Sequence, residues 1–319
     1  MKVYKARKRS LHAKLIFNPN AGAANEAARK FIEVSVALQA ADIQIEPYFI
    51  EKDCDLQEVI QGAMEQGIDL FIACGGDGTV SSVARELIGT NTILGIIPTG
   101  TQNNIAYSLG ISSNIASSVA VIAAGRRKKI DIANCTCGSK VTHCIEVCSI
   151  GLFSSLFPSA DDIRHGDFTR IGDFIATITT APPSEIHVLT DNETEMTLSG
   201  HVVLVCNMPY ILRHFQVGCK DSFEDGRMDV LFFADHSKLD LLRCAIKSAG
   251  TDFEQDSRIQ HDCVRSITID TDPPMPIMAD GIKIGEGSVK IDVQERALTV
   301  LVPKAETKAR SKSGDRLEK

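Results

Sequence analysis

The sequence has no long hydrophobic run, and this absence excludes a protein that crosses a membrane with apolar helices. Within the 319 residues, no segment reaches the roughly 18 consecutive apolar residues that such a helix needs. The basic N-terminus also lacks the apolar core of a secretory signal. We therefore expect a cytoplasmic protein that meets any membrane only as a peripheral partner, from the aqueous side.

Positive charge is scarce as well. The chain has 34 Lys and Arg against 41 Asp and Glu, a formal net charge of -7, so a broad nucleic-acid-binding surface is not expected. Basic residues gather at the start, where residues 1–14 contain six of them and no acid. This basic arm could contact an anionic surface, or it could be a solvated, frayed terminus.

The ten cysteines lack the spacing of a zinc site. Cys135, Cys137, Cys144 and Cys148 follow the pattern C-x-C-x6-C-x3-C, which matches no common zinc-binding arrangement. They lie in a segment that alternates like a β-hairpin turning at residues 138–140. We interpret all ten as reduced core or incidental residues.

No internal repeat is found, and the hydrophobic pattern divides the chain into two parts. Residues 11–131 alternate short apolar strands with helical patterns, which predicts an α/β domain with a parallel sheet. Residues 132–295 read mainly as short strands, which predicts an antiparallel β-sandwich with one convincing helix at 237–250. Residues 296–303 form the expected last strand, and the charged tail at 304–319 is expected to be disordered.

A glycine-rich loop stands between an apolar strand and a helix. The segment CGGDGTVSSVARELI places Gly75, Gly76 and Gly78 around Asp77. Glycines let backbone N–H groups face a phosphate, and Thr79 could add a hydroxyl. We expect Asp77 to be exposed and either to hold a magnesium ion or to take a proton from an attacking hydroxyl. The plainer alternative is a tight turn with an aspartate cap.

Two more loops end apolar strands at the same edge of the predicted sheet. The first strand runs into a turn with Asn18 and Gly22, and the fourth runs into a loop with Gly100, Thr101 and Asn103. Ligands of doubly wound sheets bind beyond the carboxyl ends of the strands. Three such loops together predict a shared nucleotide site.

The three motifs N-P-x-x-G, G-G-D-G-T and P-x-G-T-x-N occur in the order and at the spacing of the diacylglycerol kinase catalytic-domain family, which the chain resembles over nearly its whole length. This family includes bacterial diacylglycerol kinase-like lipid kinases and is related to the sphingosine and ceramide kinases. G-G-D-G-T alone is shared with NAD kinases. The resemblance implies a nucleotide-binding α/β domain, a C-terminal β-sandwich, and a last strand that returns to the first domain.

The resemblance also implies an activity and a set of residues. The activity is transfer of the γ-phosphoryl group of ATP to the hydroxyl of diacylglycerol or a related lipid at the membrane surface. ATP would contact the glycine loop, Ser81 and Thr101, and structural Mg²⁺ would bind Asp225 with the carbonyls of Ser222 and Arg227. A plain turn is the alternative at this last site, and a homodimer is left open.

Two positions depart from the family pattern. The usual Asn-Asp of the third loop is here Asn103-Asn104, and Ile282 stands where some bacterial members have a glutamate as base. Glu286 could replace that base or face solvent. Asp77 is then the one remaining carboxylate of the family's usual three. Ile282→Glu is expected to raise the rate, and adding Asn104→Asp to raise it further. A non-catalytic nucleotide- or lipid-binding member of the family, and more remotely an NAD kinase-like enzyme, stay open as alternatives.

Overall fold

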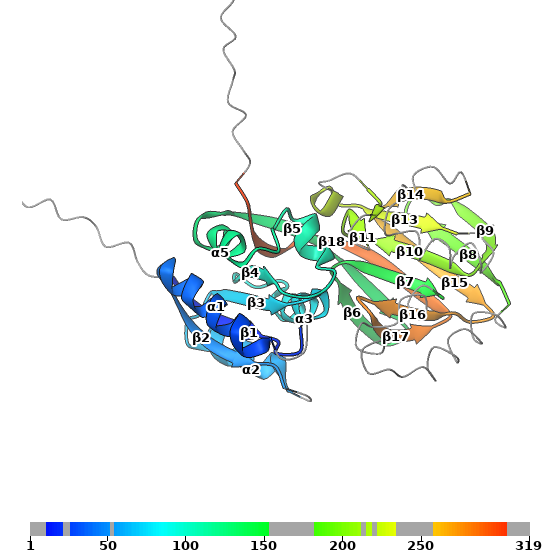
Figure 1. Ribbon diagram of the computed structural model, residues 1–319. Helices are drawn as coiled ribbons and strands as arrows, with labels where there is room; N and C mark the ends of the chain where they lie inside the picture. The colour runs from blue at the N-terminus through cyan, green and yellow to red at the C-terminus, as the bar shows by residue number, and fades with distance from the viewer. Residues whose placement is uncertain are drawn as a thin grey trace, which may run out of the picture.

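The computed structural model (Figure 1) shows an α/β half and a β-rich half side by side. It describes residues 11–21, 26–51, 54–152, 182–211, 215–218, 222–233 and 258–304. Gly22, the helix expected at 237–250, most of the basic arm and the tail from residue 305 lie outside these residues. Within the described residues, no helix is long and apolar enough to cross a membrane.

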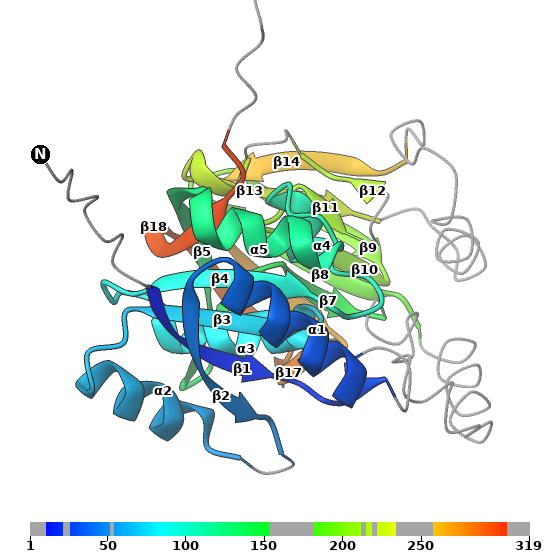
Figure 2. The same cartoon turned by 60° about the vertical axis from the view of Figure 1, so that its left-hand side comes forward.

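The N-terminal half is a parallel sheet covered by helices, as the alternating pattern predicted. Its strands lie in the order β2-β1-β3-β4, with bounds β1 (Leu11–Phe17), β2 (Ile43–Phe49), β3 (Leu70–Gly75) and β4 (Ile93–Pro98). The helices are α1 (Ala27–Ala40), α2 (Leu56–Glu65), α3 (Asp77–Leu87), α4 (Asn104–Ser108) and α5 (Ile115–Ala124). Figure 2 shows α1 and α5 on one face of the sheet and α3 on the other.

Local signals place some helix ends but not every helix. Asp55 caps α2, because its Oδ1 accepts a hydrogen bond from the Glu58 N–H at 3.0 Å. Gly67 follows the end of α2 with a φ of +84°, the left-handed conformation that favours glycine. The sequence pattern does not predict α5, because its apolar and β-branched residues hide the helical period. Its one clear signal is the cap Asn114, whose Oδ1 accepts from the Ser117 N–H.

The C-terminal half is a β-sandwich, which confirms the predicted class. One layer is a six-stranded antiparallel sheet in the order β14-β13-β10-β7-β16-β17, and its inner side chains form a core with those of the facing layer. Its strands are β7 (Val147–Gly151), β10 (Val202–Cys206), β13 (Met228–Phe232), β14 (Gln260–Val264), β16 (Pro276–Ala279) and β17 (Ile282–Glu286). The other layer contains β5 (Arg126–Cys137), β6 (Lys140–Cys144), β8 (Ser184–Thr190), β9 (Glu195–Gly200), β15 (Ser266–Asp272) and β18 (Ser288–Val302). Two short strands, β11 (Tyr210–Ile211) and β12 (Phe215–Gln216), pair separately, and a 3-10 turn spans Ser222–Glu224.

Strand β18 joins the two halves into one sheet. The sequence pattern suggested two strands here, but β18 is continuous and bulged between Gln294 and Leu298. It pairs with β15 near its start, with β5 along its length, and with β4 in parallel at Val300. The parallel strands and one sandwich layer therefore form a single ten-stranded sheet. The boundary expected after residue 131 falls inside β5.

The segment PIMADGIKI, which lies in the region read from sequence as short strands, is not one strand but a tight hairpin. Asp280 and Gly281 have φ values of +45° and +79°, which reverse the chain between β16 and β17, as Asp-Gly turns commonly do. The cysteine-rich hairpin β5–β6 is present as expected. The cysteines of the described part of the chain are free thiols.

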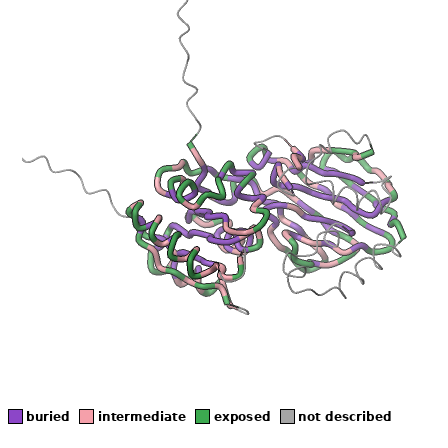
Figure 3. Tube along the Cα trace, viewed as in Figure 1, coloured by how far each residue is buried: buried purple, intermediate pink, exposed green. Residues whose placement is uncertain are grey.

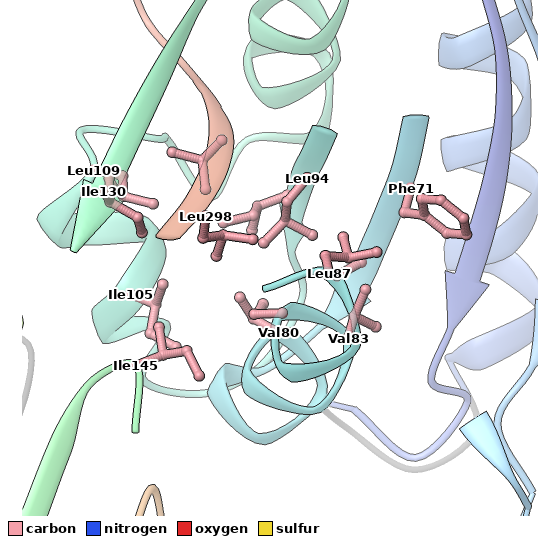
Figure 4. Packing of buried hydrophobic residues seen from close by; sticks show 14 of the residues in the cluster. Phe71, Val80, Val83, Leu87, Leu94, Ile105, Leu109, Ile130, Ile145 and Leu298 are labelled. Atoms are coloured by element: carbon pink, nitrogen blue, oxygen red, sulfur yellow. The ribbon is translucent and has the colours of Figure 1, made fainter. Parts of the chain in front are cut away.

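Burial is concentrated in the strands of both halves and in the inner faces of the helices (Figure 3). Figure 4 shows the core that supports the glycine loop: Val80, Val83 and Leu87 of α3 pack with Leu298 of β18 and with Ile105. The helix that follows the loop is thus fixed by residues from distant parts of the chain. This packing sets the position of Asp77 at the start of α3.

Candidate active site

Three loops at the carboxyl edge of the parallel strands contact one another. The loop after β1 reaches the start of α3, where Asn18 Nδ2 donates to Thr79 Oγ1 at 2.8 Å. The Asn18 N–H also donates to the Cys74 carbonyl at 3.0 Å. The loop after β4 is tied in by the Thr99 N–H, which donates to the Gly75 carbonyl at 2.9 Å. The expected residues of the three loops therefore lie together at one edge.

The glycines of these loops serve close packing more than an open phosphate cradle. A Cβ added at Gly76 would lie 3.3 Å from Gly100 Cα, and one added at Gly100 would overlap Gly76 Cα. A Cβ at Gly75 would overlap the Thr79 side chain. At Gly78, apart from the adjoining backbone, no atom of the described residues lies within 4 Å of the added Cβ. Of these four glycines, Gly78 alone thus faces space in the described structure that a ligand could enter.

The other residues expected to contact ATP differ in their surroundings. Asn103 has a φ of +56°, and its side chain closes its own loop: Oδ1 accepts from the Gly100 N–H, and Nδ2 donates to the Gly100 carbonyl. Thr101 is exposed. Ser81 is 1% exposed, and its hydroxyl has no hydrogen-bond partner among the described residues. Asn103 therefore shapes the loop, and Ser81 points into the interior.

Asp77 links the second loop to the third. Its Oδ1 accepts a hydrogen bond from the Ile105 N–H at 3.0 Å. Burial raises the pKa of the carboxyl group, while the backbone hydrogen bonds that it accepts from residues 103–105 oppose this shift. The expectation of an exposed Asp77 is wrong, because the first turn of α3 packs against the loop after β4. A half-buried carboxylate held by amides is well placed to exchange a proton.

Asp280 is a second carboxylate near this edge, and it is fully engaged. Its Oδ2 accepts from the Ile145 N–H at 2.9 Å and from Arg85 Nη2 at 3.0 Å, and its Oδ1 accepts from the Glu146 N–H at 2.8 Å. The carboxyl group is 2% exposed. Asp280 thereby fixes the hairpin β16–β17 to α3 and to the segment before β7.

Glu146 is a third carboxyl group at the same place, and none of the sequence motifs predicts it. It is 8% exposed, and its Oε1 accepts from Asn104 Nδ2 at 2.7 Å. Burial raises its pKa well above the usual range, and the negative charges of Asp77 and Asp280 add to the shift. The expectation that Asp77 stands alone is therefore wrong. A lone acid inside the apolar run HCIEVCSIG was the available signal.

The two positions considered for a missing base face solvent. Ile282 is 54% exposed at the start of β17. Glu286 is also exposed, and its Oε2 accepts from Lys283 Nζ at 3.3 Å. Its contact in the described residues is thus with Lys283 of the same hairpin.

The segment expected to bind structural magnesium has the charge for a cation but few converging ligands. Asp225 is exposed, and its Oδ1 accepts from the Arg227 N–H at 2.9 Å. Partial shielding of its carboxyl group from water raises its pKa, the hydrogen bond from the Arg227 N–H opposes this shift, and the negative charges of Asp229 and Asp131 add to it. A cation would relieve this excess of negative charge. In the described ranges no group of three or more His, Cys, Asp or Glu converges on a metal position. Carbonyl oxygens such as those of Ser222 and Arg227 would have to complete the site.

Two family models match the chain in succession. Residues 12–135 match the diacylglycerol kinase catalytic domain, and residues 168–302 match the YegS C-terminal NAD kinase beta sandwich-like domain. The first match contains the three loops described above. The second ends with β18.

Relatives among known proteins agree with these models. An uncharacterised protein of Synechocystis sp. is 27% identical over 91% of this chain and 70% of its own length. A diacylglycerol kinase of Staphylococcus saprophyticus is 34% identical, over 38% of this chain and 40% of its own length. The chain thus aligns with less than half of that enzyme.

The fold has a counterpart among solved structures. A diacylglycerol kinase from Bacillus anthracis str. Sterne superposes with a TM-score of 0.71 and 21% identity, over 94% of this chain and 99% of that one. At this identity the likeness concerns the fold. Together with the two domain models and their order, it leads to one conclusion: the chain belongs to the diacylglycerol kinase catalytic-domain family.

Proposed function

We propose that the chain is an ATP-dependent lipid kinase that transfers the γ-phosphoryl group to the hydroxyl of diacylglycerol or a related lipid. The observation that best supports this proposal is the contact of three loops around Asp77 at the carboxyl edge of the sheet. Asn18 and Thr79 meet on one side of this edge, and Asp77 accepts from the Ile105 N–H on the other. Doubly wound sheets bind their ligands at this edge.

Phosphoryl transfer depends mainly on positioning and on neutralising negative charge. The first turn of α3 leaves backbone N–H groups outside the helical hydrogen bonds, and the helix dipole favours an anion there. Gly78 gives a phosphate room to approach them. Mg²⁺ bound with ATP would neutralise phosphate charge. Asp77 is the group that takes the proton of the attacking hydroxyl.

The lipid would be reached from the aqueous side, because no helix of the described residues is suited to span a membrane. The basic arm of residues 1–14 offers an electrostatic contact with anionic lipid, worth at most about 1 kcal/mol per basic residue near the surface. Most of that arm lies outside the described residues. We therefore infer that the protein attaches to the membrane surface peripherally.

The test is a lipid phosphorylation assay with radiolabelled ATP and Mg²⁺. Diacylglycerol, ceramide and sphingosine are presented separately in mixed micelles, and NAD serves as the soluble acceptor. We expect label in one extracted lipid. Asp77→Asn keeps the size of the side chain and an oxygen for the Ile105 N–H, and it should lower the rate by about 10²–10⁴-fold.

Two results would contradict the proposal. ATP binding without transfer to any acceptor would favour a non-catalytic member of the family, the alternative suggested by the exposed Ile282. Label in NAD would favour an NAD kinase-like enzyme. Circular dichroism of Asp77→Asn shows whether a loss of activity reflects chemistry or unfolding.

A further inference from the structure

Glu146 is a buried acid that has no role in the reaction as described above. It lies between β6 and β7 and is 8% exposed. In the described part of the chain, its carboxyl group has one hydrogen-bond partner, Asn104 Nδ2, at 2.7 Å from Oε1. A buried acid with so little compensation is expensive to ionise. Acids with strongly shifted pKa values cluster at functional sites.

The hydrogen bonds of Glu146 lead directly to Asp77. Asn104 holds the Glu146 carboxyl group with its side chain, and the next residue, Ile105, holds the Asp77 carboxyl group with its N–H. The two acids therefore flank one short backbone segment at the start of α4. On the opposite side, the Glu146 N–H donates to Asp280 Oδ1.

The charged surroundings of the pair are well defined. Glu146 faces Asp77 on α3, Asp280 in the β16–β17 turn and the Cys206 thiol on β10. Arg85 pairs with Asp280 rather than with the two acids. Burial first, and then the charges of Asp77 and Asp280, raise the pKa of Glu146, and burial raises the pKa of Asp77. Two acids that interact in this way titrate together, with two apparent pKa values that belong to the pair.

We propose that Glu146 is a positioning residue of the transfer reaction, acting through Asp77 so that the two acids form one coupled proton acceptor. This inference rests on the proposed function. In the step, the O–H bond of the acceptor breaks and its oxygen bonds to the γ-phosphorus, while the bond from that phosphorus to the bridging oxygen of ADP breaks. Above the upper apparent pKa of the pair, where Glu146 is also ionised, the proton passes to Asp77, which binds it more strongly beside that second negative charge, and then leaves to solvent.

The hydrogen bond between Asn104 and Glu146 changes the expected effect of Asn104→Asp. Asn104→Asp would set two carboxylates at hydrogen-bond distance in a buried place, where like charges repel. It should lower stability rather than raise the rate. An exchange of the two groups, Asn104→Asp together with Glu146→Gln, keeps one acid and one amide in contact.

The pH dependence of kcat/KM tests the coupling. In the parent, kcat/KM should fall at low pH with the upper apparent pKa of Asp77 and Glu146, because Asp77 is most basic when both acids are ionised. This fall is the acidic limb of the profile. Glu146→Gln keeps the hydrogen bond with Asn104 but should move the limb to lower pH by about one unit, with a lower plateau rate. The exchanged double variant should move the limb back. A loss of rate with an unmoved limb would leave Glu146 a purely structural role and overturn the inference.

A second measurement does not depend on lipid phosphorylation. The folded-state pKa of Glu146 lies above its unfolded value, so its contribution to stability is present at low pH and disappears as pH rises through the folded pKa. The difference in Tm between the parent and Glu146→Gln should therefore change with pH, and the exchanged variant should again resemble the parent. Parallel Tm curves for all three proteins would overturn the coupling. Diverging curves without lipid phosphorylation would contradict the proposed function, and with it the role of Glu146 in transfer, but not the raised pKa of the buried acid.

Discussion

At the scale of single residues, the glycines around Asp77 meet two different needs. Gly75, Gly76 and Gly100 are small because two loops touch at their Cα atoms or at Thr79, whereas Gly78 faces open space. The glycines of this motif therefore differ in what their small size allows. Of the four, Gly78 is the position where a substitution tests ligand binding directly.

This division gives a prediction for two valine substitutions. Gly78→Val should preserve the fold and weaken ATP binding by tenfold or more, about 1.4 kcal/mol, since its side chain would fill space needed by phosphate. Gly76→Val should instead destabilise the protein by about 1–3 kcal/mol, because its side chain would press on Gly100. Calorimetric titration with ATP and thermal melting measure both effects. Unchanged ATP affinity in Gly78→Val would contradict the proposed phosphate position.

At the scale of secondary-structure elements, the β16–β17 hairpin is held by one buried ion pair. Arg85 Nη2 lies 3.0 Å from Asp280 Oδ2, and the two side chains are 15% and 2% exposed. Asp280 also accepts from backbone N–H groups of the segment before β7. Helix α3, which begins with Asp77, is thereby fixed to the sandwich.

Breaking this pair should be costly. Arg85→Met leaves Asp280 buried without its cation, and we expect a loss of about 3–5 kcal/mol in the free energy of unfolding. The matched control is Lys283→Met, which breaks the exposed pair with Glu286 in the same hairpin and should change stability by at most about 1 kcal/mol. Urea denaturation measures both variants. Equal effects would show that burial does not distinguish the two ion pairs.

At the scale of the whole molecule, the two halves share a sheet and a core. Strand β18 pairs with both β4 and β15, and Leu298 packs in the same cluster as α3 and β4 residues. A contact of this kind couples the unfolding of the α/β part to that of the sandwich. The molecule is expected to unfold in one cooperative transition.

The prediction at this scale concerns Leu298→Ala. Leu298 is 1% exposed, so the substitution should leave a cavity and lower the free energy of unfolding by about 2–5 kcal/mol. Hydrogen exchange should show lower protection in β3 and in β15 alike. Ile32→Ala, at a position that is 62% exposed, is the control with little effect. A loss confined to one half would contradict a shared cooperative unit.

The sequence by itself determined the features that depend on local pattern. The alternation of strands and helices, the Asp55 cap of α2 and the three loops at strand ends all follow from residues close together in the chain. Hydrophobic period, capping side chains and glycine placement act over a few residues. The α/β half, the sandwich and the edge that carries the loops were therefore predictable.

The tertiary structure decided what depends on distant residues and on burial. Glu146 and Asn104 are 42 positions apart, and Asp280 and Glu146 are 134 apart, so no local pattern brings these groups to Asp77. The same holds for Gly76 and Gly100, which are small because two loops meet. Burial raises the pKa of a carboxyl group only once other parts of the chain exclude water from it. Local sequence therefore determined the glycine-rich loop with Asp77, and the packing of separate segments brought Glu146 to it.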